Sequence, residues 1–142
     1  MTIAHRDDAN LLKLIKVAKV TVHDRQRHLA DLETAKEAAS AAHDWLAQSI
    51  RTEEEKFQSV SGGDVVSLAA FRNGTADKRK ALEATMTTLL VEIEEARDEV
   101  RDAVIEAKKL EHLLEIQQRA ARREAAKNEA ADIDDVALRM SR

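Results

Sequence analysis

The side chains of this sequence that could bind a metal or transfer a proton are five histidines and many carboxylates. The chain of 142 residues contains no cysteine. A thiol nucleophile, a disulfide and a thiolate metal site are therefore excluded. A di-iron centre in a helical bundle would require Glu-x-x-His. The residues three places before the histidines are instead Thr2, Val20, Arg25, Ser40 and Lys109. We therefore predict no metal site, no cofactor and no catalytic residue.

The individual histidines have simpler explanations than metal binding. His23 and His28 are five residues apart, which places them on different faces of a helix. His43 falls within an apolar stripe described below, where one polar side chain can fix the register of a coiled coil. The glycine pair Gly62-Gly63 indicates a turn, because it lacks the remaining residues of any nucleotide-binding motif. The sequence contains no constellation typical of an enzyme.

The composition predicts long helices, and any functional surface must therefore lie on the outside of a helix. There is no proline, there are only three glycines, 44% of the residues are hydrophobic and 35% are charged. The first residues lack the basic and apolar regions of a signal peptide, and lysines interrupt each apolar run. We expect a cytoplasmic protein. The net charge of −4 disfavours nucleic acid as a partner, although a nucleic-acid-bridging protein that uses residues 119–127 remains an alternative.

Two apolar stripes with alternating spacings of four and three residues predict a coiled coil. The first stripe comprises Leu11, Ile15, Ala18, Val22, Arg25, Leu29, Leu32, Lys36, Ala39, His43, Leu46, Ile50, Glu53 and Phe57. The second comprises Leu82, Met86, Leu89, Ile93, Ala96, Val100, Ala103, Ala107, Leu110 and Leu114. Because one turn region separates them, we expect an all-α fold, an antiparallel two-helix coiled-coil hairpin with one glycine-containing central turn.

All three glycines lie in the segment between the stripes. Gly62 is expected to close the first helix in a left-handed conformation, and Thr75 to cap the start of the second. These signals divide the chain into a first long helix over 1–58, a turn segment with a short helix of its own over 59–75, and a second long helix over 76–142. Its C-terminal tail is expected to be frayed or ordered by a partner.

The expected register pairs Phe57 with Leu82. The same register places Leu46 opposite Ile93, and it brings Arg123 level with Lys16. In this arrangement, small residues face large ones across the two stripes, as interdigitating side chains require.

The start of the first helix carries apolar residues outside its stripe. Val17 and Val20 project away from the stripe, together with Lys13 and Lys16, and Lys19 lies close by. Scattered apolar residues are ordinary on protein surfaces. Here they are crowded into one short stretch with lysines between them, so we predict a partner-binding face.

Two further features are candidates for partner binding. Arg119, Arg122 and Arg123 extend the second helix, and in the expected register they share one collar with the three lysines, suited to an acidic partner. Trp45 also lies outside the stripe. Either residues 64–71 fold back to cover its indole, or it anchors a second protein, since tryptophan is enriched in binding hot spots.

The layout of the chain resembles the FliJ family, the small coiled-coil component of the flagellar type III export apparatus. The resemblance covers nearly the full length. It rests on the apolar and basic helix start over 11–19, on the single turn, on the arginine-rich end of the second helix over 109–124, and on the acidic and apolar tail over 132–138. Of these, the tail is the most distinctive part.

The resemblance implies a non-enzymatic stalk. Such a protein would insert into the ring of the export ATPase, contact the export gate membrane protein and assist the delivery of substrates by export chaperones. It would be peripheral to the inner membrane through protein partners only. We call the end of the hairpin opposite the turn its open end. By analogy, the lysines and arginines of the collar at this end would meet the ring or the gate. The face around Val17 and Val20 is the candidate for the gate. A structural or scaffold coiled coil that dimerises is the alternative.

Overall fold

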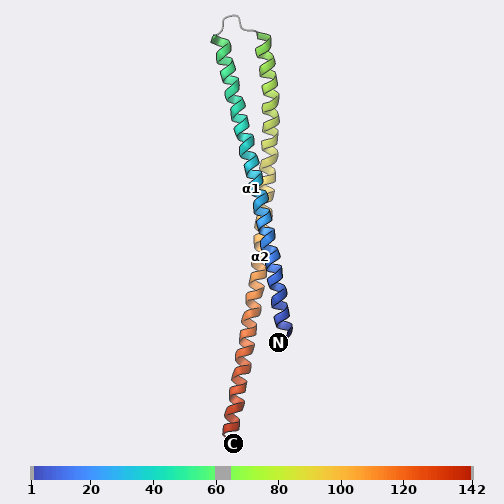
Figure 1. The fold of residues 1–142 in the computed structure, drawn as a ribbon, viewed down its shortest axis with the longest axis vertical. Coiled ribbons are helices and arrows are strands. Elements are labelled where there is room, and N and C mark those ends of the chain that lie inside the picture. The colour runs from blue at the N-terminus through green and yellow to red at the C-terminus, as the bar shows by residue number, and fades with distance from the viewer. Residues whose placement is uncertain (1, 60–64, 142) are drawn as a thin grey trace. The chain divides into compact units, whose positions relative to one another are not determined.

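The computed structural model describes residues 2–59 and 65–141, and nearly all of them are helical. Helix α1 covers Thr2–Ser59 and helix α2 covers Val65–Met140 (Figure 1). No strand occurs in these two ranges. The predicted all-α helical hairpin is therefore confirmed. Gly62, which is expected to close the first helix, lies outside the described residues.

The predicted stripes are the faces along which the two helices pack. Every position of the first stripe except Arg25 is buried or half-buried, and so is every position of the second. Between the stripe positions, alanine, glutamate, lysine and arginine keep the helices continuous, because these residues have high helix propensity. The period of 3.5 residues keeps each apolar stripe against its partner helix over many turns.

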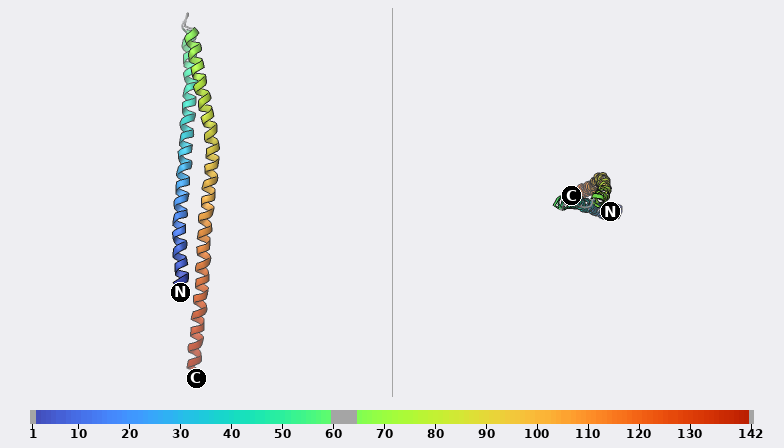
Figure 2. Two further views of the ribbon diagram at one scale, coloured as in Figure 1. Left: turned by 90° about the vertical axis from the view of Figure 1, so that its right-hand side faces the viewer. Right: turned by 90° about the horizontal axis from the view of Figure 1, so that it is seen from above.

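The described helices form two compact units. Unit 1 consists of residues Met1–Asp24 and Arg101–Arg142, and unit 2 of residues Arg25–Val100. Each unit combines a segment of α1 with an antiparallel segment of α2, and the segments lie side by side in both views (Figures 1 and 2).

Unit 2 has the better-packed core. Ile93 and Ala96 on α2 are each only 2% exposed, and Ala39 and Leu46 on α1 are also buried. Ion pairs flank this core on the surface, for example between Arg72 Nη2 and Glu54 Oε1 at 3.1 Å. Each exposed pair of this kind contributes about 0–1 kcal/mol. The apolar stripe is therefore the main source of stability.

The start of α2 differs from the sequence prediction. The pattern predicts a turn with a short separate helix over 59–75, whereas α2 is continuous from Val65. Thr75 is not a helix cap: it is buried, and its hydroxyl donates to the carbonyl oxygens of Phe71 at 2.8 Å and Arg72 at 3.1 Å. The physical reason is that Leu68, Phe71 and Thr75 continue the packed face, and one glycine in a helix costs only about 1 kcal/mol.

The register also differs from the prediction. His43 would lie level with Ala96 in the expected register, but its Nε2 lies 3.1 Å from Glu83 Oε1. The helices are thus offset by roughly three turns from the predicted pairing. The offset follows from the early start of α2, which adds residues 65–75 to the paired length.

Gly74 offers a test of the continuous helix. A Cβ atom added at this position would meet no other atom within 4 Å. Because alanine favours the helix over glycine by about 1 kcal/mol, we expect Gly74→Ala to raise the free energy of unfolding by about that amount. Chemical denaturation followed by circular dichroism measures it. A turn at this position would give a loss of stability instead.

Unit 1 has a smaller core and a long unpaired helix end. Ile15 on α1 and Ala107 on α2 are buried, and Lys19 Nζ lies 3.6 Å from Glu111 Oε1 across the helices. From residue 115 to residue 140, every residue of α2 is exposed. The red C-terminal end of α2 runs past the blue start of α1 (Figures 1 and 2).

Candidate partner-binding surfaces

The first candidate surface is the outer face of α1 in unit 1. Lys13, Lys16, Val17 and Val20 form this surface, hereafter the α1 face, and all four are exposed. The valines are 63% and 59% exposed, although apolar residues of this kind are usually buried. Neither Lys13 nor Lys16 makes an ion pair with another described residue. The α1 face therefore presents an apolar centre with two uncompensated charges.

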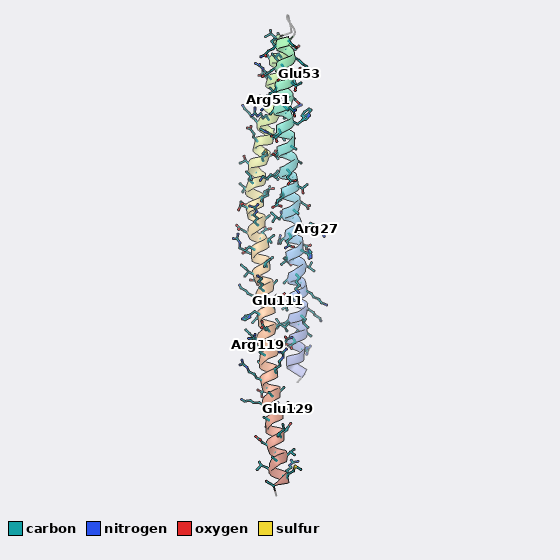
Figure 3. All side chains as sticks on the ribbon, turned by 90° about the vertical axis from the view of Figure 1, so that its left-hand side faces the viewer. Arg27, Arg51, Glu53, Glu111, Arg119 and Glu129 are labelled. Atoms are coloured by element: carbon teal, nitrogen blue, oxygen red, sulfur yellow. The ribbon has the colours of Figure 1, made fainter. Side chains whose placement is uncertain are left out.

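The second candidate surface is the arginine group on α2. Arg119, Arg122 and Arg123 are all exposed. Figure 3 shows the position of Arg119 on α2. Arg119 Nη2 lies 2.6 Å from Glu115 Oε1 one turn earlier, so part of its charge is compensated within the helix. Arg122 and Arg123 make no ion pair with the other described residues.

The lysines and arginines do not form the single collar that the expected register predicts. A groove lined by Asp7 and Asp8 of α1 faces α2 between Gln117 and Glu124. The arginines are thus level with the acidic start of α1. Lys19 lies level with Glu111, which is about two turns of α2 before Arg119. Both cationic groups belong to unit 1, but they form two separate patches.

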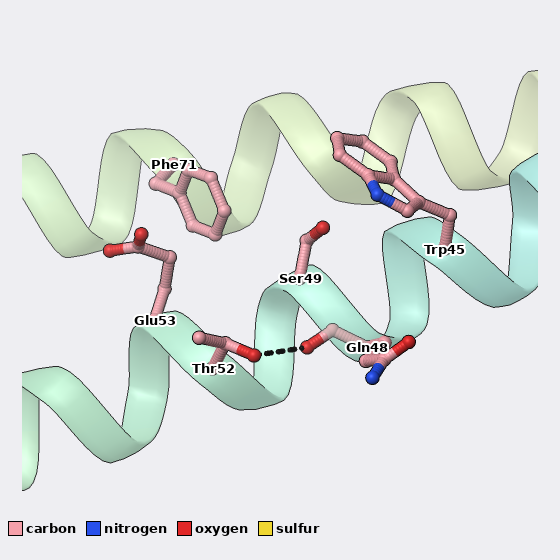
Figure 4. Close-up of a pocket in the computed structure, with 6 residues that line it drawn as sticks. All are labelled: Trp45, Gln48, Ser49, Thr52, Glu53 and Phe71. Carbon is pink, nitrogen blue, oxygen red and sulfur yellow. Dashed lines mark hydrogen bonds between the residues drawn. The ribbon is translucent and has the colours of Figure 1, made fainter.

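Trp45 is exposed and lies beside a shallow groove of unit 2. The groove has a volume of about 470 Å³ and is lined by Trp45, Gln48, Ser49, Thr52, Glu53 and Phe71. Figure 4 shows the indole of α1 and the phenyl ring of α2 at its two ends, with Ser49 between them. The indole is 66% exposed. Of the two alternatives for Trp45, covering by residues 64–71 is therefore wrong for the described residues 65–71, and the role as an anchor stays a prediction.

The histidines supply no metal site in the described part of the chain. No group of three possible metal ligands occurs there. His43 instead joins a small polar cluster: its Nε2 lies 3.4 Å from Arg79 Nε and 3.1 Å from Glu83 Oε1, and its Nδ1 lies 3.8 Å from Asp44 Oδ1. A polar cluster within an apolar stripe disfavours other registers, because a shifted helix would leave these groups unpaired.

The sequence pattern did not single out the exposed apolar residues near the end of α2 as a surface. Ile133, Val136, Leu138 and Met140 are between 54% and 85% exposed. Among them, Ile133, Val136 and Met140 are spaced by three and four residues, which is a signal of an amphipathic helix. The signal is weak by itself because the stripe of α2 first decays to polar residues after Leu114.

A comparison with known protein families covers nearly the whole chain. The family model described as flagellar FliJ protein matches residues 7–142. The chain belongs to the FliJ family. Membership makes this protein a coiled-coil component of flagellar protein export and assembly, and the family is not one of enzymes.

Two further observations complete the comparison. No curated protein and no solved structure matches this FliJ-family chain significantly. Within residues 2–59 and 65–141, no helix carries an apolar stretch long enough to cross a bilayer.

Proposed function

We propose that this FliJ-family protein is a stalk and adaptor of the flagellar export apparatus. It binds the ring of the export ATPase and the export gate membrane protein, and it assists the delivery of substrates by export chaperones. Its place is the cytoplasmic side of the inner membrane, where it is held by protein partners. Family membership and the two-helix fold support this proposal.

One observation carries the proposal further than the family does. Unit 1 exposes two cationic patches that packing does not require: the α1 face and the arginines 119, 122 and 123. Uncompensated charges beside apolar side chains are suited to an acidic surface, which they recognise and toward which they steer the protein. A ring whose central opening is lined by carboxylates has this chemistry.

Stimulation of the ATPase then requires no catalytic group on the stalk. A stalk that binds one conformation of the ring subunits more tightly than the others raises the population of that conformation. The size of the effect is limited by the difference between these affinities. The stalk therefore acts only through its docking surfaces.

The gate and the chaperones need surfaces of their own if the ring occupies the arginines. The α1 face is our candidate for the gate, because Val17 and Val20 supply an apolar centre. Trp45 is a second anchor, and its groove can accept an apolar side chain of a partner between Trp45 and Phe71.

The direct test of the proposal is ATP hydrolysis by the cognate export ATPase, titrated with this protein. We expect saturable stimulation at substoichiometric amounts relative to ATPase subunits, because one stalk serves one ring. Lys78→Glu/Lys80→Glu is a matched control, since both lysines are exposed in unit 2. The proposal fails if the wild-type protein neither binds the ATPase nor changes its rate.

Trp45→Ala distinguishes a role of Trp45 in binding from a role in stability. The side chain is mostly exposed, so we expect the free energy of unfolding to change by less than about 0.5 kcal/mol. If the indole is a hot spot, the affinity for the gate or chaperone that it contacts falls about thirtyfold, equivalent to about 2 kcal/mol. Calorimetric titration of each purified partner measures this. Unchanged affinity for all of them would remove Trp45 from the binding surface.

A further inference from the structure

The end of α2 forms a helix without a neighbour. Because Asp7 and Asp8 face residues 117–124, the start of α1 lies close to this level, and residues 128–140 continue beyond it. Figure 3 shows Glu129 on this continuation, past the end of α1. We call residues 128–140 the C-terminal extension. Because most of the stability of a helix in a protein comes from packing, a helix end without a neighbour is the least stable part of α2.

The extension is amphipathic and acidic. Ile133, Val136 and Met140 lie on one face at spacings of three and four residues, and they are 63%, 54% and 85% exposed. By helical spacing, Glu129 lies within this face between Ile133 and Val136, and Asp132 borders the face on the side of Val136. Neither carboxylate makes an ion pair with another described residue. The face thus combines an apolar stripe with two uncompensated negative charges.

The α1 face has the same pattern with opposite charge. Its members Lys13, Lys16, Val17 and Val20 are separated by three, one and three residues. The members of the extension follow the same spacing and are Glu129, Asp132, Ile133 and Val136. Each lysine of the first set thus corresponds to a carboxylate of the second, and each valine to an isoleucine or valine. Because the spacing is the same in the same chain direction, two parallel helices can place each lysine beside a carboxylate and each valine beside an isoleucine or valine.

We propose that a second copy of this chain covers the C-terminal extension by placing its α1 face there. The extension cannot reach the α1 face of its own chain, because it continues α2 without a break, and α2 packs against the stripe on the other side of α1. When two copies meet with their open ends pointing at each other, the extension of each runs parallel to the α1 of the other. The two contacts are then equivalent, as a two-fold symmetric dimer requires.

This self-association has a consequence for docking. It buries Val17 and Val20 of both copies, together with the lysines beside them, so no other protein can occupy the α1 face of a dimer. The dimer is therefore a resting form, and a partner that binds the α1 face shifts the equilibrium toward monomer.

Sedimentation velocity of the full chain over a range of concentrations tests the proposal. We expect a reversible dimer for the wild type. Lys13→Glu/Lys16→Glu should weaken association about tenfold or more, because like charges then face each other. Glu129→Lys/Asp132→Lys should do the same. All four positions are exposed, so helix content measured by circular dichroism should stay unchanged.

A mixture of the two charge-reversed variants is the most direct test. In a pair of identical variants, the α1 face of one copy and the extension of the other carry like charges. In a mixed pair both contacts have opposite charges again, so the mixture should form dimers as the wild type does. Lys78→Glu/Lys80→Glu in unit 2 should have no effect on the dimer.

A wild type that remains monomeric at about 0.2 mM, where even a weak specific dimer would be populated, would overturn the proposal. A dimer that survives in both charge-reversed variants, or a mixture that stays monomeric, would overturn it as well. If the extension of a monomeric wild type instead binds a basic partner helix, the occupant is another protein and the proposal is also wrong.

Discussion

Ile93→Ala should lower the free energy of unfolding by about 3 kcal/mol, within the range for truncation of a large aliphatic side chain in a core. Ile93 is 2% exposed and lies on the packed face of unit 2. A coiled coil of two helices has no further layer that could close the cavity. Thermal and urea denaturation followed by circular dichroism measure the loss.

Val91→Ala is the matched control for this substitution. Val91 lies two residues away on the same helix but is 56% exposed. Its truncation should change the stability by less than about 0.5 kcal/mol. Equal losses at the two positions would mean that Ile93 does not lie in a packed core, and the register of unit 2 would then be wrong.

Arg119→Glu/Arg122→Glu/Arg123→Glu should remove stimulation of the export ATPase at the concentrations at which the wild type saturates it. The variant replaces three positive charges with three negative ones on a surface that makes no contribution to the core of unit 1. Like charges brought together in an interface cost several kcal/mol. We therefore expect the concentration for half-maximal stimulation to rise at least about a hundredfold, which corresponds to about 2.7 kcal/mol.

The same variant distinguishes docking from folding. Arg122 and Arg123 have no ion pair with another described residue, and Arg119 is bonded only to Glu115 within its own helix. Helix content and the unfolding midpoint should therefore match those of the wild type. A variant that stimulates normally would exclude the arginines as the docking surface, and one that is unfolded would show that they act on the structure.

The sequence determined the packed faces well because a heptad stripe is a regular signal. From Leu11 to Phe57 and from Leu82 to Leu114, the positions with alternating spacing are the ones that pack, with Arg25 as the exception. Such a stripe can do little else than face another helix, since its period matches a coiled coil. The fold class followed from the two stripes and the single region between them.

The position of the turn could not be derived in the same way. Gly74 and Thr75 are common at helix ends, and a local rule places a boundary there. In the structure Thr75 is packed and α2 runs through both residues, because the burial of Leu68 and Phe71 outweighs the low propensity of one glycine. The register depends on this boundary, so the same error moved Lys16 and Arg123 to one level, although the pairing of Lys19 with Glu111 places them about two and a half turns apart.

The candidate surfaces were predictable in part. Exposed valines and lysines outside a stripe can be read from the heptad positions, and the structure leaves Val17, Val20 and Trp45 exposed. The groove beside Trp45 was predictable only in part, because folding residues 64–71 back onto Trp45 brings Phe71 near the indole but would cover the indole, which the structure leaves exposed. Which partner meets each surface is a property of complexes and is not encoded in the spacing of residues in one chain.

Single-cysteine crosslinking tests the central claim most directly, because the natural chain contains no cysteine. Arg123→Cys in unit 1 and Ala35→Cys in unit 2 are both exposed positions on which a photoactivatable maleimide can be placed. With the cognate ATPase and ATP present, we predict that the probe at residue 123 crosslinks to the ATPase and the probe at residue 35 does not. Crosslinks from residue 35 alone, or from neither residue while the ATPase is stimulated, would contradict docking through the open end of unit 1.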